Sequence, residues 1–130
     1  MLISVGLVVD DDPYDRGVLA EALRQAGICV LEASSGREAL KLTNTAIPHF
    51  VVTDIEMSDV DGLELCRQLR QLPATTNVPI VVVSDPAATR ADDATAAGCD
   101  VVLPKPCSPV LLLTTIRRLL VKPSGWTGRQ

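Results

Sequence analysis

The sequence predicts an α/β fold in which a five-stranded parallel sheet lies between two layers of helices, a three-layer sandwich. Five short runs of β-branched and aliphatic residues are continuous rather than alternating, as expected of strands that are buried on both faces. They begin near residues 5, 28, 50, 79 and 100, and a helix-length segment follows each of them. This repeated βα order favours parallel strands joined by right-handed crossovers. A chain of 130 residues has the length of one such domain.

Turn and capping residues set the expected boundaries of these elements. The strands are expected at Val5–Asp10, Ile28–Ala33, Phe50–Asp54, Pro79–Val83 and Asp100–Leu103. Three prolines directly follow a residue that can cap a helix, in the pairs Asp12–Pro13, Asp85–Pro86 and Ser108–Pro109. Gly27 and Gly98 are expected to end the first and fourth helices. We therefore expect the fourth helix over Pro86–Ala97, with only small side chains on its core face and, for that reason, mobile.

Composition excludes several classes of function. The net charge is −4, the 12 basic residues are scattered, and Phe, Trp and Tyr occur once each, so we expect no direct nucleic-acid binding. No apolar run approaches the roughly 18 residues that a membrane span needs, and no Lys or Arg precedes Arg16 to begin a signal peptide. The cysteines form no C-x-x-C pair and are expected to be small core residues in a reducing compartment: Cys29, Cys66, Cys99 and Cys107. We expect a cytoplasmic protein.

Acidic residues gather at the carboxyl ends of the predicted strands. Nine of the 16 acids lie there: Asp10, Asp11, Asp12, Asp15, Asp54, Glu56, Asp59, Asp61 and Asp85. In open α/β sheets this edge is where ligands bind. If the strand order is 2-1-3-4-5, the first and third strands are neighbours, and Asp10 and Asp11 lie beside Asp54. Carboxylates that close repel one another unless a cation lies among them, which predicts a divalent metal site suited to Mg²⁺.

Two further residues at the same edge can bind a phosphoryl group. Ser84 follows the fourth strand with a hydroxyl donor, and Lys105 follows the fifth with a positive charge. Mg²⁺ at such a site accepts one or two carboxylates together with a phosphoryl oxygen. Asp12 is expected to cap the first helix instead. The lone histidine, His49, opens the third strand at the other end of the sheet and is expected to be structural.

Four motifs in order resemble the receiver domain of two-component response regulators and are similar to single-domain chemotaxis regulators. They are LVVDDDP, VVTDIEMSDVDGLEL, PIVVVSD and AAGCDVVLPKP, and together they span nearly the whole chain. The resemblance implies a flavodoxin-like (βα)₅ fold over residues 1–121, with 122–130 as a tail or the start of a linker. It also implies phosphoryl transfer to Asp54 from a histidine on a sensor kinase or phosphotransfer protein.

The resemblance further implies a role for each site residue. Asp11 would bind Mg²⁺ directly, Asp10 largely through water, and Glu56 through its main-chain carbonyl. Ser84 and Lys105 would each bind a phosphoryl oxygen, and the Lys105–Pro106 bond would be cis. Once Asp54 is phosphorylated, Ser84 and Lys105 would draw the adjoining loops inward.

Three positions depart from the family pattern. Val102 stands where receivers generally carry Tyr or Phe, so we expect the output to pass through the loops or the fourth helix. Asp85 stands where a small residue is usual; it either caps the following turn or places a negative charge that slows phosphorylation. Ser58 replaces a proline, which we expect to loosen its loop.

The last helix predicts a contact surface. Its apolar residues cover more than half of its circumference, so we expect Leu112 or its neighbours to form a partner or homodimer surface.

Two alternatives to a phosphoacceptor remain open. One is a receiver fold that binds partners without phosphorylation, which Val102 and Asp85 favour. The other is a phosphatase of the haloacid-dehalogenase type, with Asp10 of the Asp10-x-Asp12 pattern as nucleophile. That alternative explains neither Asp54 nor the turn at Gly62.

Overall fold

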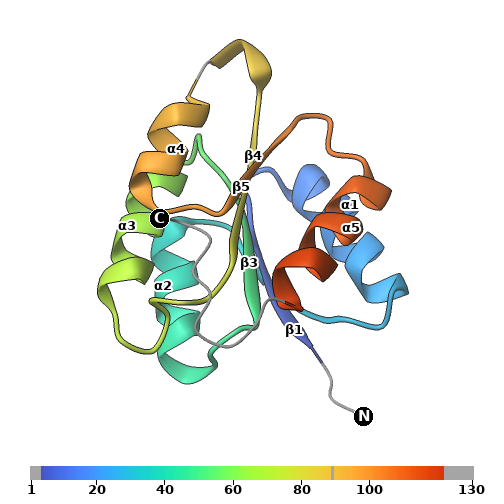
Figure 1. Cartoon of the computed structure of the whole chain (residues 1–130), viewed down its shortest axis with the longest axis horizontal. Coiled ribbons are helices and arrows are strands. Elements are labelled where there is room, and N and C mark those ends of the chain that lie inside the picture. Colours follow the sequence, from blue (N-terminus) through green and yellow to red (C-terminus); the bar gives the residue numbers. More distant parts are fainter. Residues whose placement is uncertain (1–3, 89, 122–130) are drawn as a thin grey trace.

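The computed structural model, which describes residues 4–88 and 90–121, places a parallel sheet between two layers of helices (Figure 1). The strands are β1 (Val5–Val9), β2 (Cys29–Ala33), β3 (Phe50–Asp54), β4 (Ile80–Ser84) and β5 (Val101–Pro104). The helices are α1 (Pro13–Gln25), α2 (Gly36–Thr45), α3 (Gly62–Gln71), α4 (Ala91–Ala97) and α5 (Pro109–Leu120). All strand pairs are parallel in the order β2-β1-β3-β4-β5, which confirms the predicted flavodoxin-like fold. The expected tail at 122–130 lies outside the described residues.

The core has two halves, one on each face of the sheet. Helices α1 and α5 cover one face, and α2, α3 and α4 cover the other (Figure 1). In β3, the side chains of Phe50 and Val52 pack toward α1 and α5, whereas Val51 packs toward α3. Because alternate residues face two buried layers, the central strands are apolar except near their carboxyl ends, where Thr53, Asp54 and Ser84 lie.

A glycine on β1 makes room for the single phenylalanine. Phe50 is fully buried, and a Cβ at Gly6 on the neighbouring strand would overlap its ring. The Phe50 ring therefore fits in the core because Gly6 has no side chain.

Side-chain caps begin four of the five α-helices. Asp12, Ser35, Asp61 and Ser108 each accept a hydrogen bond from a main-chain N–H of the first turn, which confirms the predicted caps at Asp12 and Ser108. Gly27 and Gly98 have φ of 87° and 113°, the left-handed conformation expected where a helix ends.

The expected helix over Pro86–Ala97 is wrong in its first half. Pro86–Ala88 forms a single 3₁₀ turn, and α4 begins only at Ala91. The Asp85 carboxylate accepts a hydrogen bond from the Ala87 N–H at 2.9 Å, so it caps this short turn. Arg90, the residue before α4, makes no side-chain capping hydrogen bond. The pair Asp85–Pro86 marks the 3₁₀ turn and not the first turn of this helix.

The prediction for Leu112 is also wrong. Leu112 is 0% exposed and packs with α1 and the sheet, whereas Val110, two residues earlier, is 74% exposed. The apolar arc of α5 is broad because the helix contacts both the sheet and α1. Dimerisation through the last helices stays a prediction, and Leu112 cannot contribute to it because its side chain is buried.

The cysteines divide into core and surface positions. Cys66 and Cys99 are buried as predicted, but Cys29 is exposed because it begins the edge strand β2. Burial raises the pKa of the Cys66 thiol to about 12 and that of the Cys99 thiol to about 11. Within residues 4–88 and 90–121, no helix combines the length and the apolar character that crossing a membrane requires.

Candidate functional site

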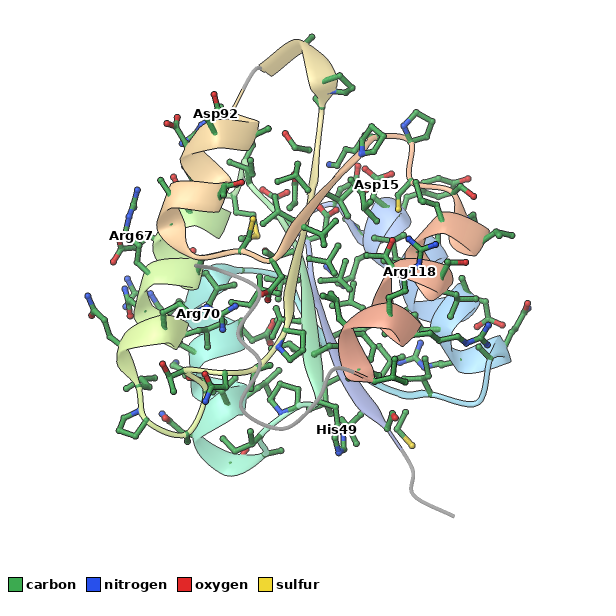
Figure 2. All side chains as sticks on the ribbon, in the orientation of Figure 1. Asp15, His49, Arg67, Arg70, Asp92 and Arg118 are labelled. Atoms are coloured by element: carbon green, nitrogen blue, oxygen red, sulfur yellow. The ribbon has the colours of Figure 1, made fainter. Side chains whose placement is uncertain are left out.

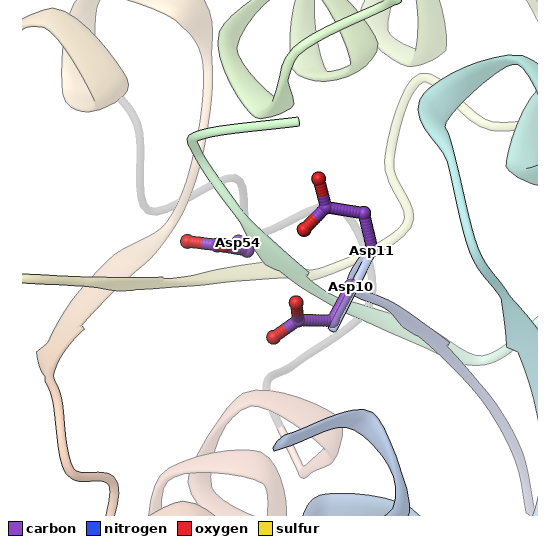
Figure 3. A group of neighbouring side chains, drawn as sticks. All are labelled: Asp10, Asp11 and Asp54. Atoms are coloured by element: carbon purple, nitrogen blue, oxygen red, sulfur yellow. The ribbon is translucent and has the colours of Figure 1, made fainter. Parts of the chain in front are cut away.

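Three carboxylates meet at the carboxyl ends of β1 and β3. Val9 pairs with Thr53 across these neighbouring strands, so the residues that follow, Asp10 and Asp54, lie side by side. One oxygen from each of Asp10, Asp11 and Asp54 lies within 4.8 Å of the others, and the three side chains turn toward a common space (Figure 3). The strand order thus assembles the predicted acidic cluster.

Both oxygens of Asp54 are held by the protein. Oδ1 accepts a hydrogen bond from the Ile55 N–H at 2.8 Å, and Oδ2 lies 3.1 Å from the Lys105 Nζ. The residue is 9% exposed. Its carboxylate is therefore fixed in direction, with one oxygen beside a positive charge at the edge of the sheet.

Asp10 is the most buried member of the cluster, at 2% exposed. Burial raises the pKa of its carboxyl, and the charge of Asp54 acts in the same direction. A hydrogen bond from the Asp12 N–H to Oδ1 at 2.9 Å and the more distant Lys105 oppose this rise. A cation among the three carboxylates would relieve the repulsion between the negative charges of Asp10 and Asp54.

Lys105 is the positive group of the site. Its Nζ lies 3.1 Å from Asp54 Oδ2 and 3.9 Å from Asp10 Oδ2. Burial lowers the pKa of the ammonium, but the hydrogen bond to Asp54 and the surrounding carboxylates outweigh it, so the pKa is raised above its usual value. Lys105 lies against two of the three carboxylates of the cluster, and this set of oxygen ligands suits a hard divalent ion such as Mg²⁺.

The ends of β4 and β5 bring Ser84 to the same edge. Ser84 pairs with Pro104, and the Lys105 N–H donates to the Ser84 carbonyl at 3.0 Å. Ser84 is buried, and among the described residues its hydroxyl makes one long contact, donating to the Asp85 carbonyl at 3.4 Å. The Lys105–Pro106 peptide bond is cis, as the resemblance implied. The structure thus brings Asp10, Asp11, Asp54, Ser84 and Lys105 to one edge.

Two cavities adjoin the site. One of about 480 Å³ opens between α1 and the segment after β5 and is lined by Asp10, Lys105 and Asp85 among others. A second, of about 230 Å³, lies beside Ser84 and Val102. The half-buried Val102 thus borders empty space where receivers generally carry an aromatic ring.

Other predicted residues lie at the rim in different roles. Asp12 caps α1, as expected. The Glu56 side chain accepts a hydrogen bond from Arg90 at 2.7 Å. The metal-binding role expected of the Glu56 main-chain carbonyl stays a prediction. Nη2 of Arg90 also lies 3.9 Å from Oδ2 of Asp61, the residue that caps α3. We missed Arg90 in the sequence because an arginine in a polar segment carries no signal of its partners.

The single histidine lies far from the acidic cluster. Figure 2 shows Asp15 at the carboxyl edge of the sheet and His49 at the opposite edge. There His49 Nδ1 accepts a hydrogen bond from the Val5 N–H at 2.9 Å, a structural contact as predicted.

Comparison with known proteins identifies the family. The sequence model of the response regulator receiver domain matches residues 7–117. Response regulator MprA of Mycolicibacterium vanbaalenii is 40% identical over 114 residues, which cover 88% of this chain and 49% of that protein. The chain belongs to the response regulator receiver domain family of two-component signalling. It spans about half the length of the MprA relatives it matches.

Solved receiver structures have the same fold. Chemotaxis response regulator CheY4 of Vibrio cholerae aligns with a TM-score of 0.83 at 29% identity, covering 92% of this chain and 100% of that one. A response regulator receiver protein from Pseudomonas putida aligns with a TM-score of 0.80 at 30% identity, covering 91% and 98%. Membership of this family sets aside the dehalogenase-type alternative.

Proposed function

We propose that the chain accepts a phosphoryl group on Asp54 from a histidine of a sensor kinase or phosphotransfer protein, in a Mg²⁺-dependent reaction. The observation that carries the proposal is Lys105 Nζ at 3.1 Å from Asp54 Oδ2, beside a cluster of three carboxylates. A nucleophilic carboxylate, a positive charge and a set of oxygen ligands for a metal thus lie at one sheet edge. Phosphoryl transfer needs this combination, because charge on the transferred group must be balanced.

Asp54 acts as the nucleophile in this proposal. The Ile55 N–H and the Lys105 ammonium hold its two oxygens, so the carboxylate does not need to rotate into position. One oxygen forms a bond to phosphorus as the bond from phosphorus to the donor nitrogen breaks. The nitrogen's electron pair leaves with the imidazole, which takes up a proton in the partner protein.

The carboxylates of Asp10, Asp11 and Asp54 and the main-chain carbonyl of Glu56 would hold the Mg²⁺. The ion would supply positive charge against the phosphoryl oxygens. Lys105 supplies a second positive charge from the segment after β5, and its raised pKa keeps it protonated at neutral pH. Neither group takes part in bond making.

Ser84 couples the phosphorylated state to the loops. Its hydroxyl makes a long contact of 3.4 Å to the Asp85 carbonyl within the described part of the chain, so it is available to donate to a phosphoryl oxygen on Asp54. That new bond would pull the segment after β4 inward and favour a second packing of the loop. Because Val102 offers no aromatic ring, the shift would reach the surface through this loop and α4, which has only alanines buried against the core.

A phosphorylation-independent binding module is the second candidate. It is favoured by the cavity of about 230 Å³ beside Val102 and by the exposed carboxylate of Asp85, which lines the larger cavity next to Lys105. A negative charge at that position would slow the approach of an anionic donor. In this case the family fold would serve only as a docking surface.

Labelling with a small acyl phosphate and Mg²⁺ tests the two candidates. Wild type is expected to gain a hydroxylamine-sensitive phosphoryl group, seen by intact-mass spectrometry, that Asp54→Asn abolishes and removal of Mg²⁺ prevents. Asp59→Asn is the matched control, because this nearby acid pairs with Arg37 outside the carboxylate cluster. It is expected to be labelled like wild type.

The alternative outcomes discriminate clearly. Absence of any label with folded protein, donor and Mg²⁺ present would favour the binding module. Label that persists in Asp54→Asn would place the acceptor elsewhere and contradict the proposed chemistry.

A further inference from the structure

The peptide unit between Asp10 and Asp11 joins two members of the acidic cluster. Rotation of this unit changes ψ of Asp10 and φ of Asp11, so it moves one carboxylate relative to the other. It lies just beyond the last residue of β1. The Asp10 N–H still donates to the Ala33 carbonyl at 3.1 Å, but the Asp10 carbonyl has no such strand partner among the described main-chain bonds.

Arg16 on α1 holds that carbonyl. Its Nη1 donates to the Asp10 carbonyl oxygen at 2.8 Å, and its Nε donates to Glu32 Oε1 on β2 at 3.1 Å. The Arg16 side chain is 19% exposed, so both bonds are shielded from bulk water. The planar guanidinium therefore connects the Asp10–Asp11 peptide to a carboxylate on the edge strand.

Glu32 is itself anchored from a second side. Its other oxygen, Oε2, lies 3.0 Å from Nη2 of Arg24, two turns further along α1. Both arginines thus share one carboxylate, but within the described contacts only Arg16 reaches the acidic cluster. This difference makes Arg24 a matched control.

We propose that Arg16 is a positioning residue: by holding the Asp10–Asp11 peptide plane against Glu32, it sets the spacing of the two carboxylates that receive the divalent cation. This inference rests on the proposed function, since it concerns the metal site used there. Partners outside the ligand shell that orient ligands typically change metal affinity by 10–100-fold when removed. Because Mg²⁺ keeps several waters, we expect the lower end of that range, about tenfold.

The test measures Mg²⁺ binding directly and separates it from folding and from chemistry. Amide NMR titration with MgCl₂ gives the dissociation constant for wild type, Arg16→Met, Arg16→Lys and Arg24→Met, and urea unfolding gives their stabilities. Arg16→Met is expected to weaken Mg²⁺ binding about tenfold. Arg24→Met is expected to stay within about twofold of wild type, since the Asp10 carbonyl keeps its partner. Lysine at position 16 can reach one of the two acceptors but not both in the same geometry. The dissociation constant of Arg16→Lys for Mg²⁺ is therefore expected to lie between those of wild type and Arg16→Met.

Phosphorylation rates at saturating Mg²⁺ add a second readout. The rate for Arg16→Met should approach that of wild type there, because Asp54 and Lys105 are unchanged and only ligand spacing is altered. Equal Mg²⁺ affinity in Arg16→Met and wild type would overturn the inference, as would equal losses in Arg16→Met and Arg24→Met. If Arg16→Met does not fold, Arg16→Lys decides the same question. Failure of wild type itself to bind Mg²⁺ would instead contradict the proposed function.

Discussion

The ion pair between Arg70 and Asp100 is expected to be a main determinant of stability. Nη2 of Arg70 on α3 lies 2.9 Å from Oδ2 of Asp100, and the two side chains are 13% and 7% exposed. Arg70 also donates to the carbonyls of Gly98 at 2.8 Å and Val78 at 2.6 Å. It therefore ties α3 to the segments that precede β4 and β5.

Substitution Arg70→Met is expected to cost about 3 kcal/mol. Removing one partner of a buried ion pair typically costs 3–5 kcal/mol, because the other charge is left buried, and the partial exposure here favours the lower end. Asp100 would keep the hydrogen bond from the Ile80 N–H at 2.8 Å but lose the one from the Arg70 guanidinium. The loss would be a large part of a total stability of about 5–15 kcal/mol.

Urea unfolding followed by circular dichroism measures this cost. With an m-value of about 1–3 kcal/mol/M, the midpoint should fall by about 1–3 M. Arg67→Met is the control on the same helix: its pair with Glu64 is about half exposed, at 50% and 47%, so its loss should cost at most about 0.5 kcal/mol. Adding Asp100→Asn to Arg70→Met should recover part of the loss, because no lone charge remains. A midpoint for Arg70→Met no lower than that of Arg67→Met would refute the reasoning.

Three further predictions concern single buried positions. Leu112→Glu should destabilise the chain by more than about 4 kcal/mol, since it places a charge in the core, whereas Val110→Glu at an exposed site should have little effect on the urea midpoint. Gly62→Ala should cost about 1–3 kcal/mol and reduce labelling of Asp54, because a Cβ there would overlap the Asp54 carbonyl; Gly17→Ala, with open space around its Cβ, should instead stabilise α1 by up to about 1 kcal/mol. Between pH 9 and 12 the Cys66 thiol, with a pKa of about 12 when folded, keeps its proton while the unfolded thiol loses it, so stability should fall by about 1.4 kcal/mol per pH unit.

Each of these has an outcome that would count against it. Equal urea midpoints for Leu112→Glu and Val110→Glu would contradict the burial of α5. A Gly62→Ala variant as stable as Gly17→Ala would mean that the loop after β3 can move away from α3. For Cys66, the comparison is with Cys66→Ala, which should lack that part of the alkaline decline; identical slopes would show that the thiol ionises equally in both states.

Much of the fold could be predicted from local patterns. Continuous apolar runs located all five strands to within one residue at either end, because the strands of a sheet covered by helices on both faces are mostly apolar. Caps at Asp12 and Ser108 were predicted because a carboxylate or hydroxyl before proline can satisfy the free N–H groups of a first turn. The motif order also predicted which residues would meet at the carboxyl edge.

Other features depended on contacts between distant segments. Leu112 or its neighbours were predicted to form a contact surface because their helix is apolar around most of its circumference. Leu112 itself is covered by α1 and the sheet, whereas Val110 and Leu111 are exposed. The start of α4 was misplaced because Asp85 and Pro86 form a capped 3₁₀ turn as readily as the first turn of an α-helix. Arg90 carries no sequence mark of its bond to Glu56, 34 residues earlier.

By itself the sequence predicted the five strands, the caps that begin α1 and α5, and which acids stand at strand ends, because those depend on residues adjacent in the chain. Only the tertiary structure decided that Lys105 lies against Asp54, that Arg16 holds the peptide between Asp10 and Asp11, and that Arg70 lies against Asp100. Each of those contacts joins segments that become neighbours only when the strand order and the two helical layers are set. A long side chain can reach many partners, and its packing decides which of them it contacts.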